Sequence, residues 1–252
     1  MDVVLVTLAS LFAGFVDAIV GGGGLILVPA LFAVYPSTAP ATLLGSNKSA
    51  SIWGSIFASA QYSRRVKLRF AALLPALLMA FIGSFLGAWL VTIIAPDFLR
   101  KSLPFLLFAI LLYTFAKKEL GHHHAPRLQA SHEVWAICTI GLVLGFYDGF
   151  FGPGTGSFLV FVFVRFLGYD FLNASANAKL INVATNLAAL ILFSLKGHVW
   201  WHLALPMALA NIVGSLLGTR LALKHGTGFV RVMFLLVVSA LICKTSYDAF
   251  FK

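Results

Sequence analysis

The sequence predicts an all-α, polytopic membrane protein built from two homologous and inverted repeats with broken or re-entrant helices. Three observations predict this fold class: the apolar composition, an internal duplication and the distribution of charge between loops. Of the 252 residues, 60% are hydrophobic and 10% are charged, whereas soluble domains carry about 25% charged residues. With a mean hydropathy of +0.97, a water-soluble chain of this length would expose large apolar patches. We therefore expect lipid to surround most of the chain.

Apolar segments follow one another along the chain, separated by short polar or glycine-rich stretches. They lie at residues 3–20, 24–35, 43–62, 70–95, 98–116, 134–151, 156–169, 174–195, 203–223 and 229–248. At about 20 apolar residues per spanning helix, the length allows roughly eight to ten crossings. The segment 24–35 is too short for an untilted span, and we expect a half-helix there that enters the membrane and returns with the segment before it.

The second half of the chain repeats the first at a constant offset. Gly14-Phe15-Val16-Asp17 recurs as Gly145-Phe146-Tyr147-Asp148, 131 residues later. Without a gap, the same offset aligns Gly21 with Gly152, Gly23 with Gly154, Lys48 with Lys179, Pro75 with Pro206, Gly83-Ser84 with Gly214-Ser215, Gly87 with Gly218 and Arg100 with Arg231. Residues as scarce as Asp, Lys, Pro and Arg do not align together by composition alone. We expect a first repeat over 1–118, a polar linker over 119–132 and a second repeat over 133–252, in one membrane domain.

The loop charges indicate that the repeats are inverted. The loop 63–69 is strongly basic, whereas its counterpart after the eighth segment holds only Lys196 and His198. One loop later the pattern reverses, because Asp97, Arg100 and Lys101 nearly balance while their counterpart carries Arg220, Lys224 and Arg231. Since Lys and Arg collect in cytoplasmic loops, equivalent loops are expected on opposite sides of the membrane. Loops 63–69 and 117–133 then face the cytoplasm, and residues 35–40 and both termini face out.

Several other classes of protein are disfavoured. The net charge of +10 is explained by basic loops, and no basic run alternates with aromatic residues, so we expect no nucleic-acid binding. Cys138 and Cys243 lie inside apolar segments and are expected to be small buried residues rather than a disulfide. The N-terminus lacks a basic region and a cleavage site, which favours a retained span over a signal peptide. His122-His123-His124 lacks acidic or cysteine companions, and we expect no cofactor and no metal site.

Glycines interrupt the apolar pattern at matched places. Gly21-Gly22-Gly23-Gly24 and Gly152-Pro153-Gly154-Thr155-Gly156 each follow one apolar run and precede another. Glycine leaves helical geometry at little cost, and irregular backbone at membrane depth is tolerated only inside protein or beside a water-filled cavity. The half-helix after each break would direct its free N–H groups at an anion, and a tight turn at the membrane surface is the alternative. Here we select Gly22, Gly23, Gly154 and Thr155 as candidate substrate-binding residues.

Four ionisable residues lie within apolar segments: Asp17, Lys48, Asp148 and Lys179. A charge at the bilayer centre costs about 2.5–3.5 kcal/mol, so each needs a partner or a role. They could pair within repeats, as Asp17–Lys48 and Asp148–Lys179, or converge between the repeats. Snorkelling of the lysines to the interface is a further alternative. We predict that the lysines bind the substrate charge, and that the aspartates hold the lysines or accept a coupling proton. A carboxylate pair of an intramembrane enzyme is disfavoured, because no catalytic constellation accompanies it.

Amide and hydroxyl side chains surround the two lysines. They are Thr42, Ser46, Asn47, Ser49 and Ser51 in one half and Asn173, Asn177, Asn182, Thr185 and Asn186 in the other. Such donors can ligate an oxyanion, and hydrogen bonding between helices, worth about 0.6 kcal/mol on average, is the alternative. We select Asn47 and Asn177 as candidate substrate ligands. The small-residue pairs Gly83/Gly87 and Gly214/Gly218 are expected to serve close helix packing instead.

Three stretches carry a family resemblance. They are Gly14 to Pro29 (GFVDAIVGGGGLILVP), Gly45-Ser46-Asn47-Lys48, and Gly145 to Gly156 (GFYDGFFGPGTG). Together they resemble the sulfite exporter TauE/SafE family of bacterial inner-membrane proteins, and the resemblance extends over essentially the whole chain. It implies a permease fold with duplicated halves and the export of small sulfur-containing anions, such as sulfite or organosulfonates.

These patterns predict a multi-pass inner-membrane protein, not an enzyme, that moves a small anion by alternating access. Its expected partners are the anion, the lipid bilayer and a coupling proton, and the sequence leaves a homo-oligomer open. An anion channel is one alternative, distinguished by flux that does not saturate and ignores the proton gradient. A non-transporting membrane scaffold or assembly factor is the other, and it predicts that all four ionisable residues tolerate loss of their charge.

Overall fold

The computed structural model describes residues 1–66, 68, 70–94 and 130–250, and within them the chain is helical, without strands. The elements are α1 (Asp2–Val20), α2 (Gly24–Val34), α3 (Pro40–Tyr62), α4 (Phe70–Ile93), α6 (Ala130–Phe150), α7 (Thr155–Arg165), α8 (Phe171–Leu195) and α9 (Trp201–Phe250). They match the expected segments in order and type, which confirms the all-α class. The expected segment 98–116, the histidines 122–124 and most of the linker 119–132 lie outside the described residues.

Local signals set several helix ends. Gly21 ends α1 in the left-handed region (φ 80°), and its N–H bonds to the Asp17 carbonyl, as is common at helix C-termini. Pro40 stands in the first turn of α3, where its missing N–H costs nothing. Asp170 caps α8 by accepting a hydrogen bond from the Asn173 N–H at 2.8 Å. Gly226 (φ 72°, ψ −163°) divides α9 into two helices, as the separate segments 203–223 and 229–248 predicted.

Five helices of the described part are long and apolar enough to cross a membrane: Asp2–Val20, Leu73–Ile93, His132–Phe150, Phe171–Leu195 and Trp201–Gly226. By contrast, α2 and α7 have 11 residues each, or about 16 Å at 1.5 Å per residue. This is roughly half of a 30 Å hydrocarbon core, so α2 has the half-helix length that the sequence predicted. α3 is 23 residues long but rich in small polar side chains.

Two equivalent rows of large apolar side chains face outward. On α4 they are Leu74, Leu78, Ile82 and Leu86, and on α9 they are Leu205, Leu209, Val213 and Leu217, each 131 residues later. Residues four apart share one helix face. Exposed leucine rows of this kind are suited to lipid, so both repeats present the same helix to the bilayer.

The two repeats are interlocked rather than side by side. Gly83 and Gly87 on α4 lie against the backbone of α6 at Leu142 and Phe146. The equivalent Gly214 and Gly218 on α9 lie against the backbone of α1 at Leu11 and Phe15. A contact that recurs with the partners exchanged is the mark of a two-fold relation. Each small-residue pair therefore packs on the first helix of the other repeat, as expected for close helix packing.

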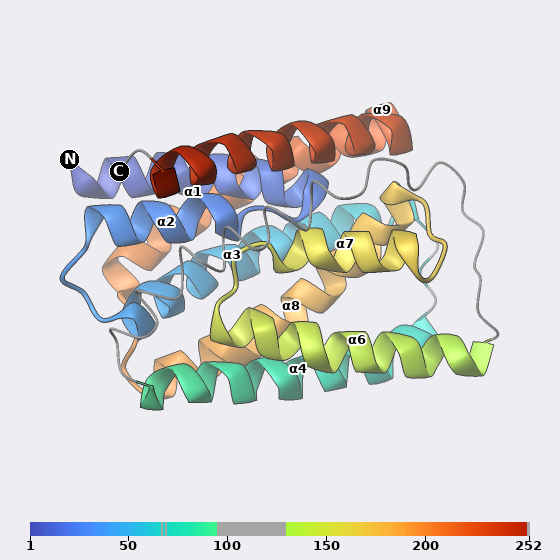
Figure 1. The fold of residues 1–252 in the computed structure, drawn as a ribbon, viewed down its shortest axis with the longest axis horizontal. Coiled ribbons are helices and arrows are strands. Elements are labelled where there is room, and N and C mark those ends of the chain that lie inside the picture. Colours follow the sequence, from blue (N-terminus) through green and yellow to red (C-terminus); the bar gives the residue numbers. More distant parts are fainter. Residues whose placement is uncertain (67, 69, 95–129, 251–252) are drawn as a thin grey trace.

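The central helices α3 and α8 are tied to the opposite repeat in the same reciprocal manner. Ser84 Oγ on α4 donates to the Thr185 carbonyl of α8 at 2.7 Å, and Ser215 Oγ on α9 donates to the Gly54 carbonyl of α3 at 2.5 Å. Figure 1 shows that α1 runs from left to right and the equivalent α6 from right to left. The equivalent first helices α1 and α6 thus point in opposite directions.

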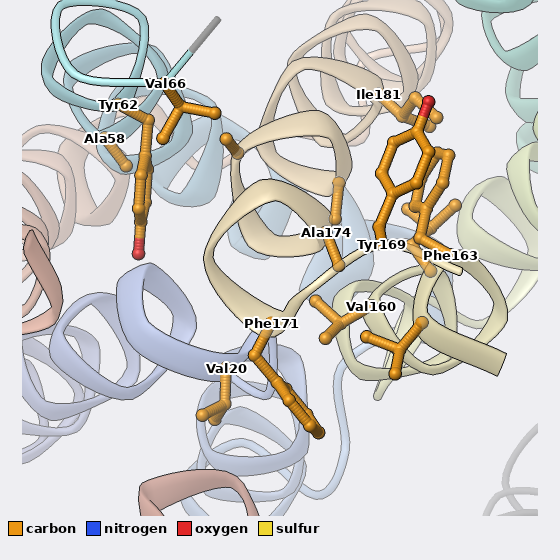
Figure 2. Close-up of a cluster of buried hydrophobic side chains, with 14 of the residues drawn as sticks. Val20, Ala58, Tyr62, Val66, Val160, Phe163, Tyr169, Phe171, Ala174 and Ile181 are labelled. Atoms are coloured by element: carbon orange, nitrogen blue, oxygen red, sulfur yellow. The ribbon is translucent and has the colours of Figure 1, made fainter. Parts of the chain in front are cut away.

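Buried side chains form separate clusters toward the two ends of the molecule. One cluster joins α1, α3, α7 and α8 and includes Val20, Tyr62, Val160, Phe163 and Tyr169. In Figure 2 the Tyr62 ring points from α3 toward α1, where its hydroxyl donates to the Ala18 carbonyl at 2.9 Å. A second cluster, which we call the apolar seal, comprises Val28, Ala41, Leu44, Ala88, Val91, Ala189, Leu192, Phe193, Val199 and Ala204, with Leu190 packed against it.

We predict that Gly87→Val and Gly218→Val destabilise the protein by similar amounts. Each substitution places a side chain against the backbone of the facing helix at equivalent positions, and overpacking costs about 1–3 kcal/mol. The melting temperature of the purified protein should fall by about 2–10 °C in each variant. Leu217→Val, at the exposed neighbour of Gly218, is the control and should change it little. Loss of stability in only one glycine variant would contradict the equivalence of the two interfaces.

A candidate substrate site between the two repeats

Two buried ion pairs join the repeats. Lys48 Nζ on α3 donates to Asp148 Oδ2 on α6 at 2.6 Å, and Lys179 Nζ on α8 donates to Asp17 Oδ2 on α1 at 2.7 Å. The sequence left open whether these residues pair within repeats or between them. In the structure each lysine pairs with the aspartate of the other repeat, so the pairing Asp17–Lys48 and Asp148–Lys179 is wrong. The reciprocal exchange follows the same two-fold relation as the helix packing.

The lysines do not snorkel. Each is the ninth residue of its helix, and the side chains of Lys48 and Lys179 are 2% and 0% exposed. The two aspartates differ more in their exposure to solvent: the side chain of Asp148 is 7% exposed and that of Asp17 is 20% exposed. Removing one partner of such a pair costs about 3–5 kcal/mol, because the remaining charge is left buried without its counter-charge.

The two glycine breaks meet beside these pairs. The N–H of Ser157, which directly follows the second break, donates to the Gly21 carbonyl of the first at 3.0 Å, and Ser157 Oγ donates to the Val20 carbonyl at 3.1 Å. A Cβ on Gly21 would overlap the backbone of Gly156. The breaks are therefore inside the protein, where irregular backbone is tolerated at membrane depth, and not separate turns on the surface of the molecule.

Each break also contacts an ion pair. The Gly23 N–H donates to Asp17 Oδ1 at 3.3 Å. A Cβ on Gly152, which has φ 87°, would lie 3.3 Å from Lys48 Nζ, so the absence of a side chain there lets the ammonium approach the backbone. Gly22, Gly23 and Gly154 are buried, and Gly154 begins α7 in the left-handed region at φ 82°.

Part of the hydrogen-bonding capacity that the sequence assigned to an anion is already used. The Gly23 N–H donates to the Asp17 carboxylate. The Thr155 N–H and Thr155 Oγ1 both donate to the Gly152 carbonyl, at 3.3 Å and 2.9 Å. Free N–H groups at the starts of α2 and α7 are therefore fewer than the sequence suggested. The two lysine ammonium groups are the stronger candidates for an anion.

The asparagines near the lysines differ in their partners. Asn177 Nδ2 donates to the Asn173 carbonyl of its own helix at 2.8 Å. Asn47 Oδ1 and Asn182 Oδ1 are buried without a hydrogen-bond partner within the described part of the chain. A Cβ on Gly156 would lie 2.9 Å from Asn182 Nδ2, which places this amide at the meeting of the two breaks. The sequence selection missed Asn182, although its position three residues after Lys179 predicts a shared helix face.

The four ionised side chains sum to zero charge, and a buried neutral arrangement of this kind is stable only while every charge keeps its partner. Among the described residues, no group of three or more His, Cys, Asp or Glu side chains is arranged to hold a metal ion. The site thus contains two ion pairs, carried by α1, α3, α6 and α8, and each pair lies beside one of the two breaks.

The sulfite exporter TauE/SafE family model matches residues 6–245. The chain belongs to this family. Among its relatives, the probable membrane transporter protein YfcA of Escherichia coli K12 is 37% identical over 240 residues, covering 95% of this chain and 88% of YfcA. A probable membrane transporter protein of Haemophilus influenzae is 36% identical over 253 residues, covering 98% of each chain.

A further relative of this TauE/SafE member is the probable membrane transporter protein ORF9 of a Sinorhizobium species, 38% identical over 242 residues, which cover 95% of this chain and 90% of ORF9. No solved structure matches the chain. With five candidate spans among the described residues and its family, the protein is a multi-pass membrane protein of a transporter family. The family resemblance inferred from the glycine breaks and the Gly45–Lys48 stretch is confirmed.

The loop between α8 and α9 in this TauE/SafE protein lies on the first turns of α3. The Trp200 N–H donates to Ser46 Oγ at 3.1 Å, and His198 Nδ1 lies 3.2 Å from Thr42 Oγ1. Burial, with a smaller contribution from Lys196, holds the pKa of the His198 imidazole below its usual 6.5. This loop therefore favours neutral His198.

We predict that the folded protein loses stability as the pH falls below about 6.5, and that His198 contributes to this loss. Because its folded-state pKa is lowered, the unfolded state binds more protons between the two pKa values, and unfolding becomes easier as pH falls. Melting temperatures measured between about pH 7.5 and pH 5.5 should fall less in His198→Gln than in the wild type. Parallel curves for the two proteins would contradict this role.

Proposed function

We propose that this protein is a secondary transporter that moves a small anion across the inner membrane by alternating access. The observation that carries the proposal is the pair of buried lysines, each held by the aspartate of the other repeat, at the meeting of two helix breaks. Buried ionisable residues in membrane segments are costly and mark substrate or proton pathways. The family name supports a sulfur oxyanion, such as sulfite or an organosulfonate, as the substrate.

The ion pairs suggest how an anion and a proton move together. With both aspartates ionised, Lys48 and Lys179 have no charge left for a substrate. When Asp17 or Asp148 takes up a proton, its lysine is released, and the ammonium accepts one negative charge of the substrate in place of the carboxylate. The site is then again neutral. The substrate ligands in this proposal are Lys48, Lys179, Asn47, Asn177 and Asn182, with backbone groups of Gly22, Gly23 and Gly154 and the side chain of Thr155.

Alternating access requires two conformations of similar energy related by the exchange of the repeats. The reciprocal contacts support this, because each contact between the repeats has an equivalent contact with the partners exchanged. Breaking either one of such a pair of contacts should cost a similar free energy. The opposite directions of α1 and α6 (Figure 1) and the alternating loop charges support an inverted arrangement in the membrane. Asp17 and Asp148 would then be reached by protons from different sides, in turn, as the halves rock about the fixed site.

The experiment is transport by the purified full-length protein in liposomes. Efflux of sulfite, of organosulfonates and of small carboxylates is measured with and without an imposed pH gradient. Saturable efflux of one sulfur oxyanion class that responds to the gradient is expected. Flux that does not saturate and ignores the gradient would indicate an anion channel, and no flux or anion-dependent stabilisation of any tested compound would favour a scaffold or assembly factor.

A further inference from the structure

Buried polar atoms without hydrogen-bond partners gather toward one end of α3. Ser55 Oγ, Ser59 Oγ and Gln61 Nε2 lack a partner within the described residues, as does Thr219 Oγ1 on α9. Ser55, Ser59 and Thr219 are 1%, 5% and 0% exposed. All three α3 residues follow Lys48 along the helix, between the ion pairs and the loop that begins at Ser63. We call Ser55, Ser59 and Thr219 the polar track, since Ser55 and Ser59 share one face of α3, whereas Gln61 lies on another face of the helix.

The two helices that carry the polar track lie against each other. Ser215 Oγ on α9 donates to the Gly54 carbonyl, next to Ser55 on α3. Farther along, Tyr62 at the end of α3 bonds to Ala18 of α1, and a Cβ on Gly218 would lie 3.1 Å from the Ala18 side chain. Thr219 therefore lies at the level of the last turn of α3, and the four orphaned groups lie at one end of the same pair of helices.

The equivalent positions of the other repeat are mostly apolar. At the offset of 131 residues, Ser55, Ser59, Gln61 and Thr219 correspond to Asn186, Leu190, Leu192 and Ala88. Leu190, Leu192 and Ala88 belong to or pack on the apolar seal, together with Phe193, the counterpart of Tyr62. The end of the molecule that carries the polar track and the end that carries the apolar seal are thus built from equivalent helices but differ in polarity.

An unpartnered polar group inside a protein costs about 1–3 kcal/mol, and within a membrane such groups persist where they line a water-filled space. Water or an anion can supply hydrogen-bond partners of this kind, since hydroxyl and amide groups both donate to an oxyanion. We infer that the polar track is the route by which water and the anion pass between the ion pairs and the loop 63–66, while the apolar seal closes the opposite end in this conformation. The anion's use of this route rests on the proposed function, whereas its hydration does not.

Cysteine accessibility tests the route without any substrate. In the full-length protein in nanodiscs, with Cys138 and Cys243 replaced by Ala, single cysteines are introduced as Ser59→Cys and Thr219→Cys, and at their repeat counterparts as Leu190→Cys and Ala88→Cys. The probe is a methanethiosulfonate reagent that carries a sulfonate. We expect the two polar-track cysteines to react at least about tenfold faster than their counterparts. Equal rates, faster reaction in the apolar seal, or no reaction at either end would overturn the inference.

The Thr219 and Ala88 pair keeps this comparison independent of folding defects, since cysteine is close to both residues in size. Each variant is also labelled after denaturation, so that an unreactive thiol is distinguished from an oxidised one.

Transport supplies a second readout. Ser59→Leu copies the residue at position 190 into the polar track, and it should lower the transport rate at least about tenfold while leaving the stabilisation of the protein by sulfite unchanged. Wild-type flux in this variant would overturn the anion route. A wild-type protein that neither binds nor transports any anion would refute the proposed function instead, and the cysteine rates would still decide whether the track is hydrated.

Discussion

Exchanging one ion pair for a neutral pair, in the double variant Lys179→Met with Asp17→Asn, should leave a folded protein whose transport falls at least about 100-fold. Replacing a buried ion pair by groups of similar size is often neutral for stability, because the cost of desolvating both charges disappears together with their attraction. Transport should nevertheless fail, since the released ammonium is the group proposed to bind the anion. Flux into and out of liposomes and the melting temperature are measured on the same preparations.

The single variants separate folding from function. Lys179→Met leaves Asp17 buried without its counter-charge and should cost stability as well as transport, and Lys48→Met should cost more, because Asp148 is 7% exposed against 20% for Asp17. Lys196→Met, at an exposed loop lysine, is the matched control and should behave as wild type. Wild-type flux in the neutral double variant would exclude Lys179 as a substrate ligand.

The second large effect is expected from Gly21→Ala. At φ 80° an added methyl is strained by about 1–2 kcal/mol, and it would also overlap the Gly156 backbone, for which overpacking adds about 1–3 kcal/mol. The melting temperature should fall by about 5–20 °C, and transport should be lost because the two breaks separate.

Gly197→Ala is the control for this variant, since Gly197 has a similar φ of 73° and an added methyl there would meet nothing within 4 Å. Only the strain is then expected, which corresponds to a fall of about 2–8 °C with flux preserved. If both variants lose the same stability, the close approach of the two breaks contributes nothing measurable, and the contact between Gly21 and Gly156 is not what holds the site together.

Much of the fold follows from local patterns. Within the described residues, the expected apolar segments are helices with ends near the expected ones, because hydrophobic runs and helix-ending residues such as Gly21 and Gly226 act over a few residues. The family also followed from the glycine breaks and the lysine-bearing stretch. Asn182 was not selected, because its importance depends on its position beside the Gly156 backbone, and that contact joins segments that are not adjacent in the sequence.

The ion pairs show most clearly what could be predicted from the sequence and what could not. The sequence by itself determined that the scarce charges Asp17, Lys48, Asp148 and Lys179 are duplicated with the helices that carry them, because a fixed offset is visible without any structure. Only the tertiary structure decided that Lys48 pairs with Asp148 and Lys179 with Asp17. The reason is physical: the small-residue faces of α4 and α9 pack each repeat onto the first helix of the other, and this exchange brings each lysine to the aspartate of the opposite repeat.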